Sequence, residues 1–316
     1  VTADIAAQNY AATLVQTPQR QALIAFYGST NGDLWYSNSG WKTEPLYPDG
    51  FALPGTEGTW YGVTVDSGTQ LVTVISLAYN NLTGSLPPAL GLLTGLTTLA
   101  LDHNALTGSV PAEVGNLTNL VQFNLNANQL SGSIPPELGI LSNLTQLRLS
   151  NNKLTGSIPP QLATLNSLSF LYLDENLLSG SIPVELGSMT NLLGLYLSDN
   201  DLTGSIPAEL GNMSSLYYLE LADNGLTGSI PVELGYLGYL ITLKLQNNPL
   251  TGFIPTTLGE LANLDELWLD NTALYGSFPL TFTTNTTMYH VSFSDTLICE
   301  PALPGFDTWK ATVTNY

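Results

Sequence analysis

The residues that could perform catalysis are too few and too far apart to form a catalytic centre. The two histidines, His103 and His290, are separated by 187 positions, and Cys299 is the single cysteine. A hydrolase needs a nucleophile beside a base, or two carboxylates that converge in one pocket. No cluster of histidine, cysteine and carboxylate residues has the spacing of a zinc site. We therefore expect no enzyme activity, no bound metal and no cofactor.

A second group of side chains is spaced so that it could bind a ligand. Aromatic and charged residues stand 24 positions apart from 148 to 268, and two further aromatics stand at 170 and 218. The candidate ligand-binding residues are Arg148, Phe170, Tyr172, Tyr196, Tyr218, Glu220, Lys244 and Trp268. Exposed aromatic side chains are typical anchors of interfaces and of sugar-stacking platforms. The alternative is that these aromatics suit strands and cover one another across coils.

The same 24-residue interval organises the middle of the chain. Asparagine recurs at 80, 104, 128, 152, 176, 200, 224 and 248 without an insertion or deletion, each time within the frame L-x-x-N-x-L. A repeat of this length indicates a solenoid, in which each unit adds one strand and buries its leucines only against its neighbours. We expect about ten coils of 24 residues.

Within one repeat, the residue types predict a fixed order of elements. Leu147 and Leu149 alternate with Arg148, so the leucines face inward and the arginine lies on the solvated face. Asn152 turns inward, where its amide can bond backbone groups of adjacent coils. Gly156 permits a positive-φ turn. The following P-x-x-L-x-x-L stretch is too short for an α-helix and predicts a 3-10 turn.

The motif N-x-L-T-G-S-I-P-x-x-L-G, which begins at Asn200, resembles the plant-type leucine-rich repeat, and the resemblance covers about Val72 to Ile298. It implies an α/β fold, a right-handed solenoid with a parallel sheet on the concave face, 3-10 turns on the convex side and a helical N-terminal cap. That family includes receptor-kinase ectodomains and polygalacturonase-inhibiting proteins. Its members are extracellular and bind peptides, proteins or glycans on the concave or lateral face.

The N-terminal stretch resembles the N-terminal cap of that family. A helix is expected around residues 21–27, and Trp60-Tyr-Gly-Val begins a strand that pairs with the first coil. Plant caps carry a cysteine pair beside this strand, whereas Gly58 and Val65 occupy the two places here. The missing disulfide points to a bacterial or algal relative. We expect a single structural domain with a cap at 1–71, a solenoid at 72–298 and a second cap at 299–316.

At the other end, the asparagine column is replaced by Thr272 and then Thr296, each of which keeps one hydroxyl. Phe306 and Trp309 supply bulky apolar groups that could seal the last coil. We expect Cys299 to be a buried residue of this cap.

The chain is strongly acidic, with 6 basic and 25 acidic residues and a net charge of −19. Nucleic acid and anionic membranes are therefore poor partners, while cationic peptides, calcium or neutral sugars are compatible, as is a role in solubility alone. No apolar run reaches the roughly 20 residues that span a bilayer. The start at Val1 shows no basic-then-apolar signal, as expected of a cleaved chain. We expect a secreted or cell-surface protein without membrane insertion.

Several surface features leave alternatives open. Carboxylates at the strand exits, such as Asp199 and Asp223, form either a binding row or a solvated rim. Gly194 could leave a dip for a ring-shaped ligand. A regular column of threonine and serine in T-G-S raises ice binding, known for one plant member of the family. Sequons for N-glycosylation occur at Asn81, Asn116, Asn143, Asn212 and Asn285.

The sequence therefore predicts a recognition module that binds a glycan or an extended peptide or protein on its concave face, by stacking on aromatic rings. The alternative is a structural or adhesive surface protein that self-assembles through the solenoid. Loss of binding in a monomeric variant without the aromatics would favour the first, and dissociation of an oligomer would favour the second.

Overall fold

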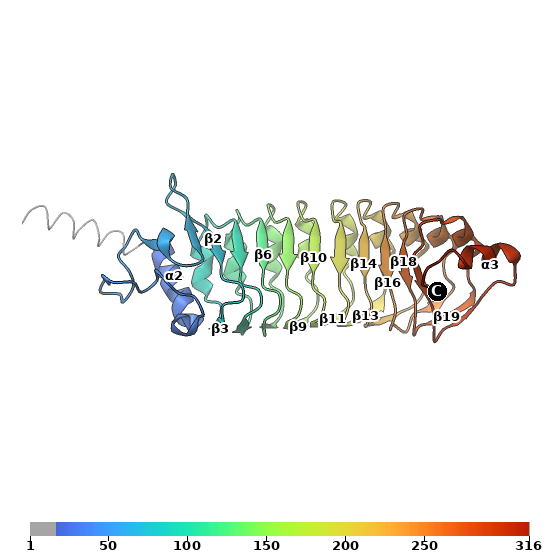
Figure 1. The fold of residues 1–316 in the computed structure, drawn as a ribbon, viewed down its shortest axis with the longest axis horizontal. Coiled ribbons are helices and arrows are strands. Elements are labelled where there is room, and N and C mark those ends of the chain that lie inside the picture. Colours follow the sequence, from blue (N-terminus) through green and yellow to red (C-terminus); the bar gives the residue numbers. More distant parts are fainter. Residues whose placement is uncertain (1–16, 316) are drawn as a thin grey trace, which may run out of the picture. The chain divides into compact units, whose positions relative to one another are not determined.

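Each coil of the repeat runs through a main strand, an asparagine turn, a short second strand and a 3-10 turn (Figure 1). In one such coil, the main strand β14 (Tyr218–Glu220) is followed by β15 (Gly225–Thr227) and by the 3-10 turn η9 (Val232–Tyr236). Between the last two, Gly228 has a φ of 78°, which glycine adopts without a steric penalty. The main strand, the asparagine turn and the 3-10 turn confirm the prediction from sequence, which did not include the second strand.

The structure, a computed structural model, describes residues 17–315, which fall into an N-terminal unit ending at Lys153 and a C-terminal unit beginning at Leu154. The main strands of the N-terminal unit are β1 (Val63–Val65), β2 (Val72–Ser76), β4 (Thr98–Ala100), β6 (Gln122–Asn124) and β8 (Gln146–Arg148). Those of the C-terminal unit are β10 (Phe170–Tyr172), β12 (Gly194–Tyr196), β14, β16 (Thr242–Lys244), β18 (Glu266–Trp268) and β20 (His290–Ser292). Within each unit neighbouring main strands pair in parallel, apart from the antiparallel pair β1–β2.

The second strands form smaller sheets. They are β3 (Thr83–Ser85), β5 (Ala105–Thr107), β7 (Ser131–Gly132), β9 (Lys153–Gly156), β11 (Leu177–Gly180), β13 (Asp201–Ser205), β15, β17 (Thr251–Gly252), β19 (Ala273–Ser277) and β21 (Leu297–Cys299). In the N-terminal unit β3 pairs with β5. In the C-terminal unit β11 pairs with β9 and β13, β13 pairs with β15, and β19 pairs with β17 and β21.

The 3-10 turns complete the coils and close the core. They are η3 (Pro88–Leu92), η4 (Ala112–Asn116), η5 (Pro136–Ile140), η6 (Pro160–Thr164), η7 (Val184–Ser188), η8 (Ala208–Asn212), η9, η10 (Thr256–Glu260) and η11 (Leu280–Thr284). In the coil of β14, the buried leucine and isoleucine side chains are Leu216, Leu219, Leu221, Leu226, Ile230, Leu234 and Leu237, none more than 2% exposed. Because each coil contributes this set, the apolar interior is shared between neighbouring coils.

Within each unit, the inward-facing asparagines connect a coil to the one before it. The Asn200 amide nitrogen donates to the carbonyl oxygens of Leu173, Leu197 and Ser198 at 3.0 to 3.2 Å. Its oxygen accepts from the Leu178 amide at 3.0 Å. The side chain thus satisfies backbone groups that would otherwise be buried without a partner. At the end of the column Thr272 keeps one such bond, from its hydroxyl to the Leu269 carbonyl oxygen.

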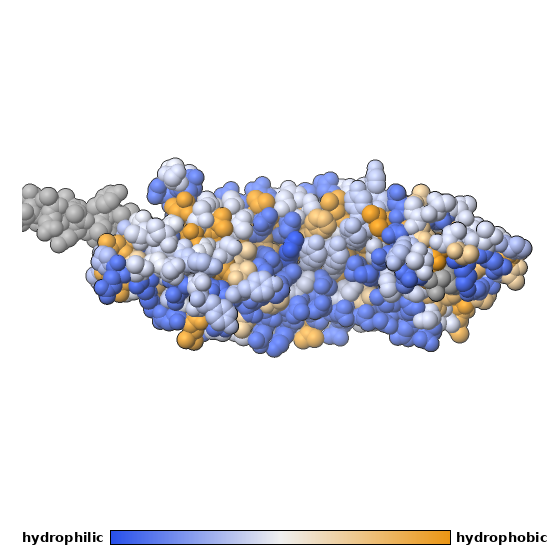
Figure 2. All heavy atoms as spheres, viewed as in Figure 1, coloured by the Kyte–Doolittle hydropathy of each residue, from blue (hydrophilic) through white to orange (hydrophobic). Residues whose placement is uncertain are grey.

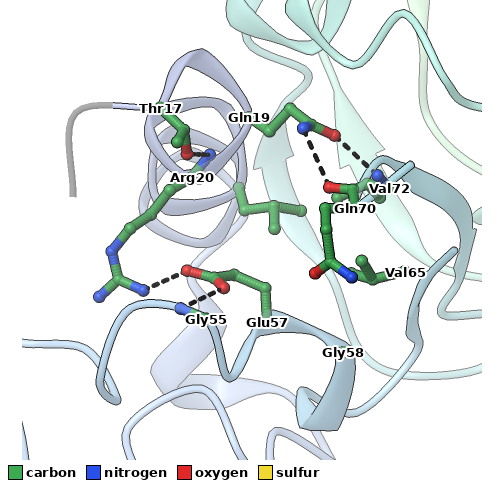
Figure 3. Close-up of a pocket in the computed structure, with 10 residues that line it drawn as sticks. Thr17, Gln19, Arg20, Gly55, Glu57, Gly58, Val65, Gln70 and Val72 are labelled. Atoms are coloured by element: carbon green, nitrogen blue, oxygen red, sulfur yellow. Dashed lines mark hydrogen bonds and ion pairs between the residues drawn. The ribbon is translucent and has the colours of Figure 1, made fainter. Parts of the chain in front are cut away.

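The N-terminal cap consists of the helix α2 (Pro18–Ser29), the 3-10 turns η1 (Gly32–Leu34) and η2 (Glu57–Thr59), and β1. Buried aromatic rings fill it, including Trp41 and Trp60 with centroids 4.7 Å apart. The α2 side chain Arg20 is 1% exposed and forms ion pairs with Asp49 and Glu57. Figure 3 shows its contact with Glu57 beside a small cavity of about 120 Å³. The expected helix and W-x-G-V strand are confirmed.

Gly58 and Val65, which stand where plant caps carry cysteines, lie opposite each other at this cavity (Figure 3). A Cβ atom built on Gly58 would be 3.4 Å from the Val65 Cβ. Disulfides have a Cβ–Cβ separation of about 3.5–4.5 Å. The backbone therefore holds the two positions close to disulfide distance although neither residue is cysteine.

The C-terminal cap contains the helix α3 (Pro304–Lys310). Its Phe306 and Trp309 are buried, and both rings pack against Phe278 of the last coils, with centroids 5.8 and 5.7 Å away. These two residues seal the coil as predicted. The expectation for Cys299 is wrong, because it is exposed on the edge strand β21, where its thiol contacts the Gly276 carbonyl oxygen at 3.3 Å.

The surface drawn in Figure 2 is mainly hydrophilic, and its apolar side chains lie in separate patches. Among residues 17–315, no helix has the length and apolar character needed to cross a membrane. Of the five sequons, Asn285 is buried, and its side-chain amide donates to the carbonyl oxygens of Leu261 and Leu264. Since this amide is enclosed in the fold, Asn285 is not available for glycosylation in the folded protein.

Candidate functional site: the open face of the C-terminal unit

The outward-facing side chains of the C-terminal main strands form two columns, because the strands pair in register. The first column is Tyr172, Tyr196, Glu220, Lys244, Trp268 and Ser292. The second column is Phe170, Gly194, Tyr218, Thr242, Glu266 and His290. We call these two columns the open face. Seven of the eight side chains predicted from sequence lie on it, on strands about 4.8 Å apart.

The eighth predicted residue, Arg148, lies in the N-terminal unit. It is half-buried on β8, and it pairs in register with Asn124 of β6. The site is therefore built here from the C-terminal unit alone.

Four aromatic rings of the open face stack on one another. The rings of Tyr172 and Tyr196 are 4.5 Å apart between centroids and 8° from parallel. Phe170 lies 5.9 Å from Tyr172, and Tyr218 lies 6.3 Å from Tyr196, with interplanar angles of 19° and 22°. We call these four residues the ring stack. Because Tyr172 and Tyr196 sit on adjacent strands, the stacking direction runs from strand to strand, and Tyr196 has a neighbouring ring on the strand to either side.

Gly194 lies within the ring stack but leaves no dip. It is buried, and a Cβ atom placed on it would come within 2.6 Å of Tyr196 Cε2 and 2.9 Å of Phe170 Cδ1. The two rings occupy the space above the glycine themselves. The dip for a ring-shaped ligand that the sequence suggests is therefore absent, since glycine here serves to let the rings approach.

The hydroxyl of Tyr196 has a raised pKa. Burial is the largest cause, because it disfavours the phenolate, and the tyrosines on either side and the charge of Glu220 add to it. Tyr196 is therefore neutral across the physiological range and keeps its hydroxyl as a hydrogen-bond donor.

The two charged members of the first column neutralise each other. Lys244 Nζ lies 3.1 Å from Glu220 Oε1, with side-chain exposures of 29% and 20%. The pair follows the ring stack directly along the column. A ligand that extends beyond the rings therefore meets a lysine whose charge is already compensated.

Trp268 belongs to a different group of contacts from the ring stack. Its indole ring lies 3.6 Å from the His290 ring between centroids, at 23°, and its Nε1 donates to Glu266 Oε2 at 3.1 Å. One face of the indole is therefore covered by the imidazole. The open face thus has an aromatic region at β10–β14 and a second, mixed region at β18–β20.

Sequence reasoning missed two features next to this face. Tyr217 extends the run of rings toward Tyr239, with centroids 6.4 Å from Tyr218 and 5.8 Å from Tyr239. Tyr217 immediately precedes β14, and Tyr239 lies in the turn before β16, so both stand outside the two columns that the sequence comparison used. The other feature is a cavity of about 690 Å³ at the C-terminal end of the face, lined in part by Asp270 and His290.

Acidic side chains at the strand exits of the C-terminal unit form a row in which some carboxylates lie close enough to repel one another. The pKa of Asp199 is raised, first by burial and then by the charges of Asp223 and Glu175. Asn247 donates to Asp223 at 2.7 Å. Within residues 17–315, no group of three histidine, cysteine or acidic side chains is placed to hold a metal ion.

A family model described as Leucine Rich Repeat matches residues 72–93, 119–141, 143–165, 167–189, 191–213, 215–237 and 239–261. The chain belongs to the leucine-rich-repeat family. Sequence comparison with curated proteins gives no match.

Solved structures of leucine-rich-repeat proteins are similar over most of this chain. The ectodomain of the receptor kinase GASSHO1/SCHENGEN3 from Arabidopsis thaliana, in complex with CASPARIAN STRIP INTEGRITY FACTOR 2, is 36% identical with a TM-score of 0.79. The match covers 89% of this chain and 33% of that one. The Arabidopsis receptor kinase HAESA, in complex with the peptide hormone IDA and the co-receptor SERK1, is 29% identical with a TM-score of 0.64, covering 77% and 49%.

A third leucine-rich-repeat structure, a plant ice-binding protein, is 26% identical with a TM-score of 0.74. Here the match covers 95% of this chain and 94% of that one. The chain thus spans a third of the GASSHO1 chain and about half of the HAESA chain, but nearly all of the ice-binding protein.

Proposed function

We propose that this protein is an extracellular recognition module that binds an extended peptide or protein segment on the open face of the C-terminal unit. The observation that carries the proposal is the ring stack. Tyr196 is stacked on Tyr172 and has Tyr218 on its other side, so its ring edge and hydroxyl are the parts that it mainly offers a ligand. Edges and hydroxyls contact side chains and backbone amides of a peptide, whereas sugar platforms use free ring faces.

Two further observations support a peptide over a glycan. The one tryptophan of the open face is stacked on His290, so that ring too has a covered face. The HAESA structure contains a bound peptide hormone and the GASSHO1 structure contains CASPARIAN STRIP INTEGRITY FACTOR 2, and both proteins share the fold of this chain. Parallel strands about 4.8 Å apart also present side chains at intervals that an extended segment can follow.

A combined peptide and glycan array tests the proposal. The wild type should give specific peptide signals that Tyr172→Ala/Tyr196→Ala removes. The matched control is Tyr236→Ala, because Tyr236 is 67% exposed in the same unit but lies on η9, outside the open face. Light scattering on each variant reports the oligomeric state. Glycan signals that depend on the rings, or an oligomer that dissociates when they are removed, would contradict the peptide proposal.

A second candidate function, ice binding, is favoured by the second strands. Exposed hydroxyl side chains recur there in successive coils, at Ser179, Thr203, Thr227 and Thr251, with further exposed serines at 181, 205 and 229. The similarity to a plant ice-binding protein extends over nearly the whole of both chains. Inhibition of ice recrystallisation by the wild type, lost in Thr203→Lys/Thr227→Lys but kept in Thr190→Lys, would support this function. Absence of inhibition in the wild type would exclude it.

A further inference from the structure

The cavity at the C-terminal end of the open face has walls from three parts of the C-terminal unit. The last strands contribute Asp270 and His290, the segment after β21 contributes Glu300, and α3 contributes Lys310. The chain after α3 returns to the sheet, where Asn315 bonds the backbone of Val291 and Tyr289 at 2.9 and 3.0 Å. The cavity is therefore built by the fold of the cap on the last coil.

Asp270 is the carboxylate of this cavity that lacks a counter-ion. Its Oδ1 accepts from the Ser294 amide at 2.8 Å and the Ser294 hydroxyl at 2.7 Å, and its Oδ2 accepts from the Ser292 hydroxyl. Burial raises its pKa, but these hydrogen bonds outweigh burial and hold the pKa below its usual value. In the described part of the chain, Asp270 forms no ion pair. The backbone amide of Asp270 itself is a further hydrogen-bond donor to this carboxylate.

The other ionisable groups of the cavity leave the charge of Asp270 uncompensated. Lys310 Nζ is 2.5 Å from Glu300 Oε1, so these two charges cancel. Burial lowers the pKa of His290 despite the charges of Glu266 and Asp270, so the imidazole is neutral at pH 7. Its Nε2 atom is buried and makes no hydrogen bond within residues 17–315. A donor that reached this nitrogen from the cavity would add a hydrogen bond that the folded chain lacks.

We propose that the cavity binds a primary ammonium group between Asp270 and His290. An ammonium has three N–H donors and no acceptor, so it can interact with the carboxylate of Asp270 and donate to the unpaired nitrogen of a neutral imidazole. Its positive charge supplies the counter-ion that Asp270 lacks. The group has two sources, the N-terminal amine of a peptide or a lysine side chain.

The cavity and the ring stack are separate sites, and ammonium binding in the cavity does not depend on the proposed function. Only the inference that one ligand occupies both sites rests on it. From β10 to β20 there are five strand spacings, roughly 24 Å in total, which an extended segment of about seven residues spans. A peptide that lies on the ring stack would then place its amino end, or a lysine, in the cavity.

Binding of small amines by the whole chain tests the proposal without a known peptide. The probes are leucine amide, which carries only an α-ammonium, and N-acetyl-lysine methylamide, which carries only a side-chain ammonium. N-acetyl-leucine methylamide is the uncharged control and N-acetyl-leucine the anionic one. The readout is the NMR indole signal of Trp268, which stacks on His290 and is assigned with Trp268→Phe.

The proposal predicts that at least one ammonium probe shifts the Trp268 signal and that the uncharged and anionic probes do not. Lys310→Met should tighten amine binding several-fold, because it removes the cation that occupies Glu300. Asp270→Asn should weaken binding fivefold to tenfold, while Asp199→Asn, a strand-exit carboxylate outside the cavity, should leave it unchanged. Thermal melting checks that Asp270→Asn is folded, and Lys310→Met provides an independent test with the opposite sign.

Two results would overturn the proposal: no shift with either ammonium probe, or binding of the anionic probe that Lys310→Met abolishes. Which ammonium probe binds more tightly identifies the source of the group. Loss of peptide binding in Tyr172→Ala/Tyr196→Ala is measured separately. Failure at the cavity and failure at the ring stack are therefore distinguishable.

Discussion

The phenol rings of Tyr172 and Tyr196 face each other across adjacent strands, 4.5 Å apart and 8° from parallel. The contact limits which parts of these two side chains remain exposed. Each of these two rings gives one face to the other, and Tyr218 lies 6.3 Å from Tyr196 on the next strand. The aromatic residues that the sequence places on an exposed surface therefore cover much of their own apolar area, and they present edges and hydroxyls.

Gly194→Ala should disrupt the ring stack. The added methyl would lie 2.6 Å from Tyr196 Cε2, so the rings must move. We expect a loss of stability of about 1–3 kcal/mol, typical of overpacking, together with weaker peptide binding. Urea unfolding measures the first effect. Gly238→Ala is the control, because nothing lies within 4 Å of a Cβ at that position. Equal stability of the two variants would show that the rings yield without strain.

Gly58→Cys/Val65→Cys should form a disulfide in the N-terminal cap. The Gly58 Cβ position is 3.4 Å from the Val65 Cβ, close to disulfide geometry, and the closed loop is short. Loop-closure entropy predicts a gain of about 2 kcal/mol on oxidation. The change in melting temperature between oxidised and reduced protein measures it. Free thiols that persist after oxidation would show that the two positions are not aligned as the structure has them.

Arg20→Ala should destabilise the N-terminal cap more than loss of an exposed ion pair would. Arg20 is buried, and its removal leaves Asp49 and Glu57 without their cation. These carboxylates are 20% and 16% exposed, so solvent relieves part of the cost, and we expect roughly 2–3 kcal/mol. Denaturant unfolding provides the value. Lys42→Ala, which breaks the exposed pair with Asp33, should cost under about 1 kcal/mol.

Asp199→Asn should stabilise the protein slightly at neutral pH. The pKa of Asp199 is raised in the folded state, so its protonated form favours folding below the unfolded pKa. That contribution disappears as the pH rises through the folded pKa, where the charged carboxylate faces Asp223 and Glu175. Solvent screening limits the gain at pH 7 to a few tenths of a kcal/mol. The melting temperatures of the wild type and Asp199→Asn, measured from pH 3 to pH 7, should converge at acidic pH. A stability gain that is larger at acidic than at neutral pH would contradict the prediction.

Much of the fold could be predicted because it follows from residues that repeat. Each repeated residue type has one structural role, and that role recurs from coil to coil. Examples are the core leucines, the glycine of T-G-S and the asparagine at 200. Thr272 marked the end of the asparagine column equally clearly. Column positions also predicted which side chains share the open face, because parallel strands pair in register.

The parts that sequence did not predict depend on side-chain conformation and on the caps. Alternation places Tyr196 outward but does not say whether its ring stands beside Tyr172 or lies flat. Gly194 suggested a gap because its neighbours' rotamers were unknown. Cys299 was expected inside because cysteine is usually buried, yet it lies on the edge strand β21, where no further coil covers it. The cavity at Asp270 is lined in part by the chain after α3, which returns to the sheet. That segment lies outside the repeats, so the repeat pattern could not predict it.

The most direct test of the central claim is isothermal titration of the strongest array peptide against the wild type, Tyr196→Ala and Tyr236→Ala. We predict that Tyr196→Ala weakens binding at least tenfold, about 1.4 kcal/mol, and that Tyr236→Ala binds as the wild type does. Equal affinity in all three proteins, with Tyr196→Ala still folded and monomeric, would contradict a recognition site on the open face.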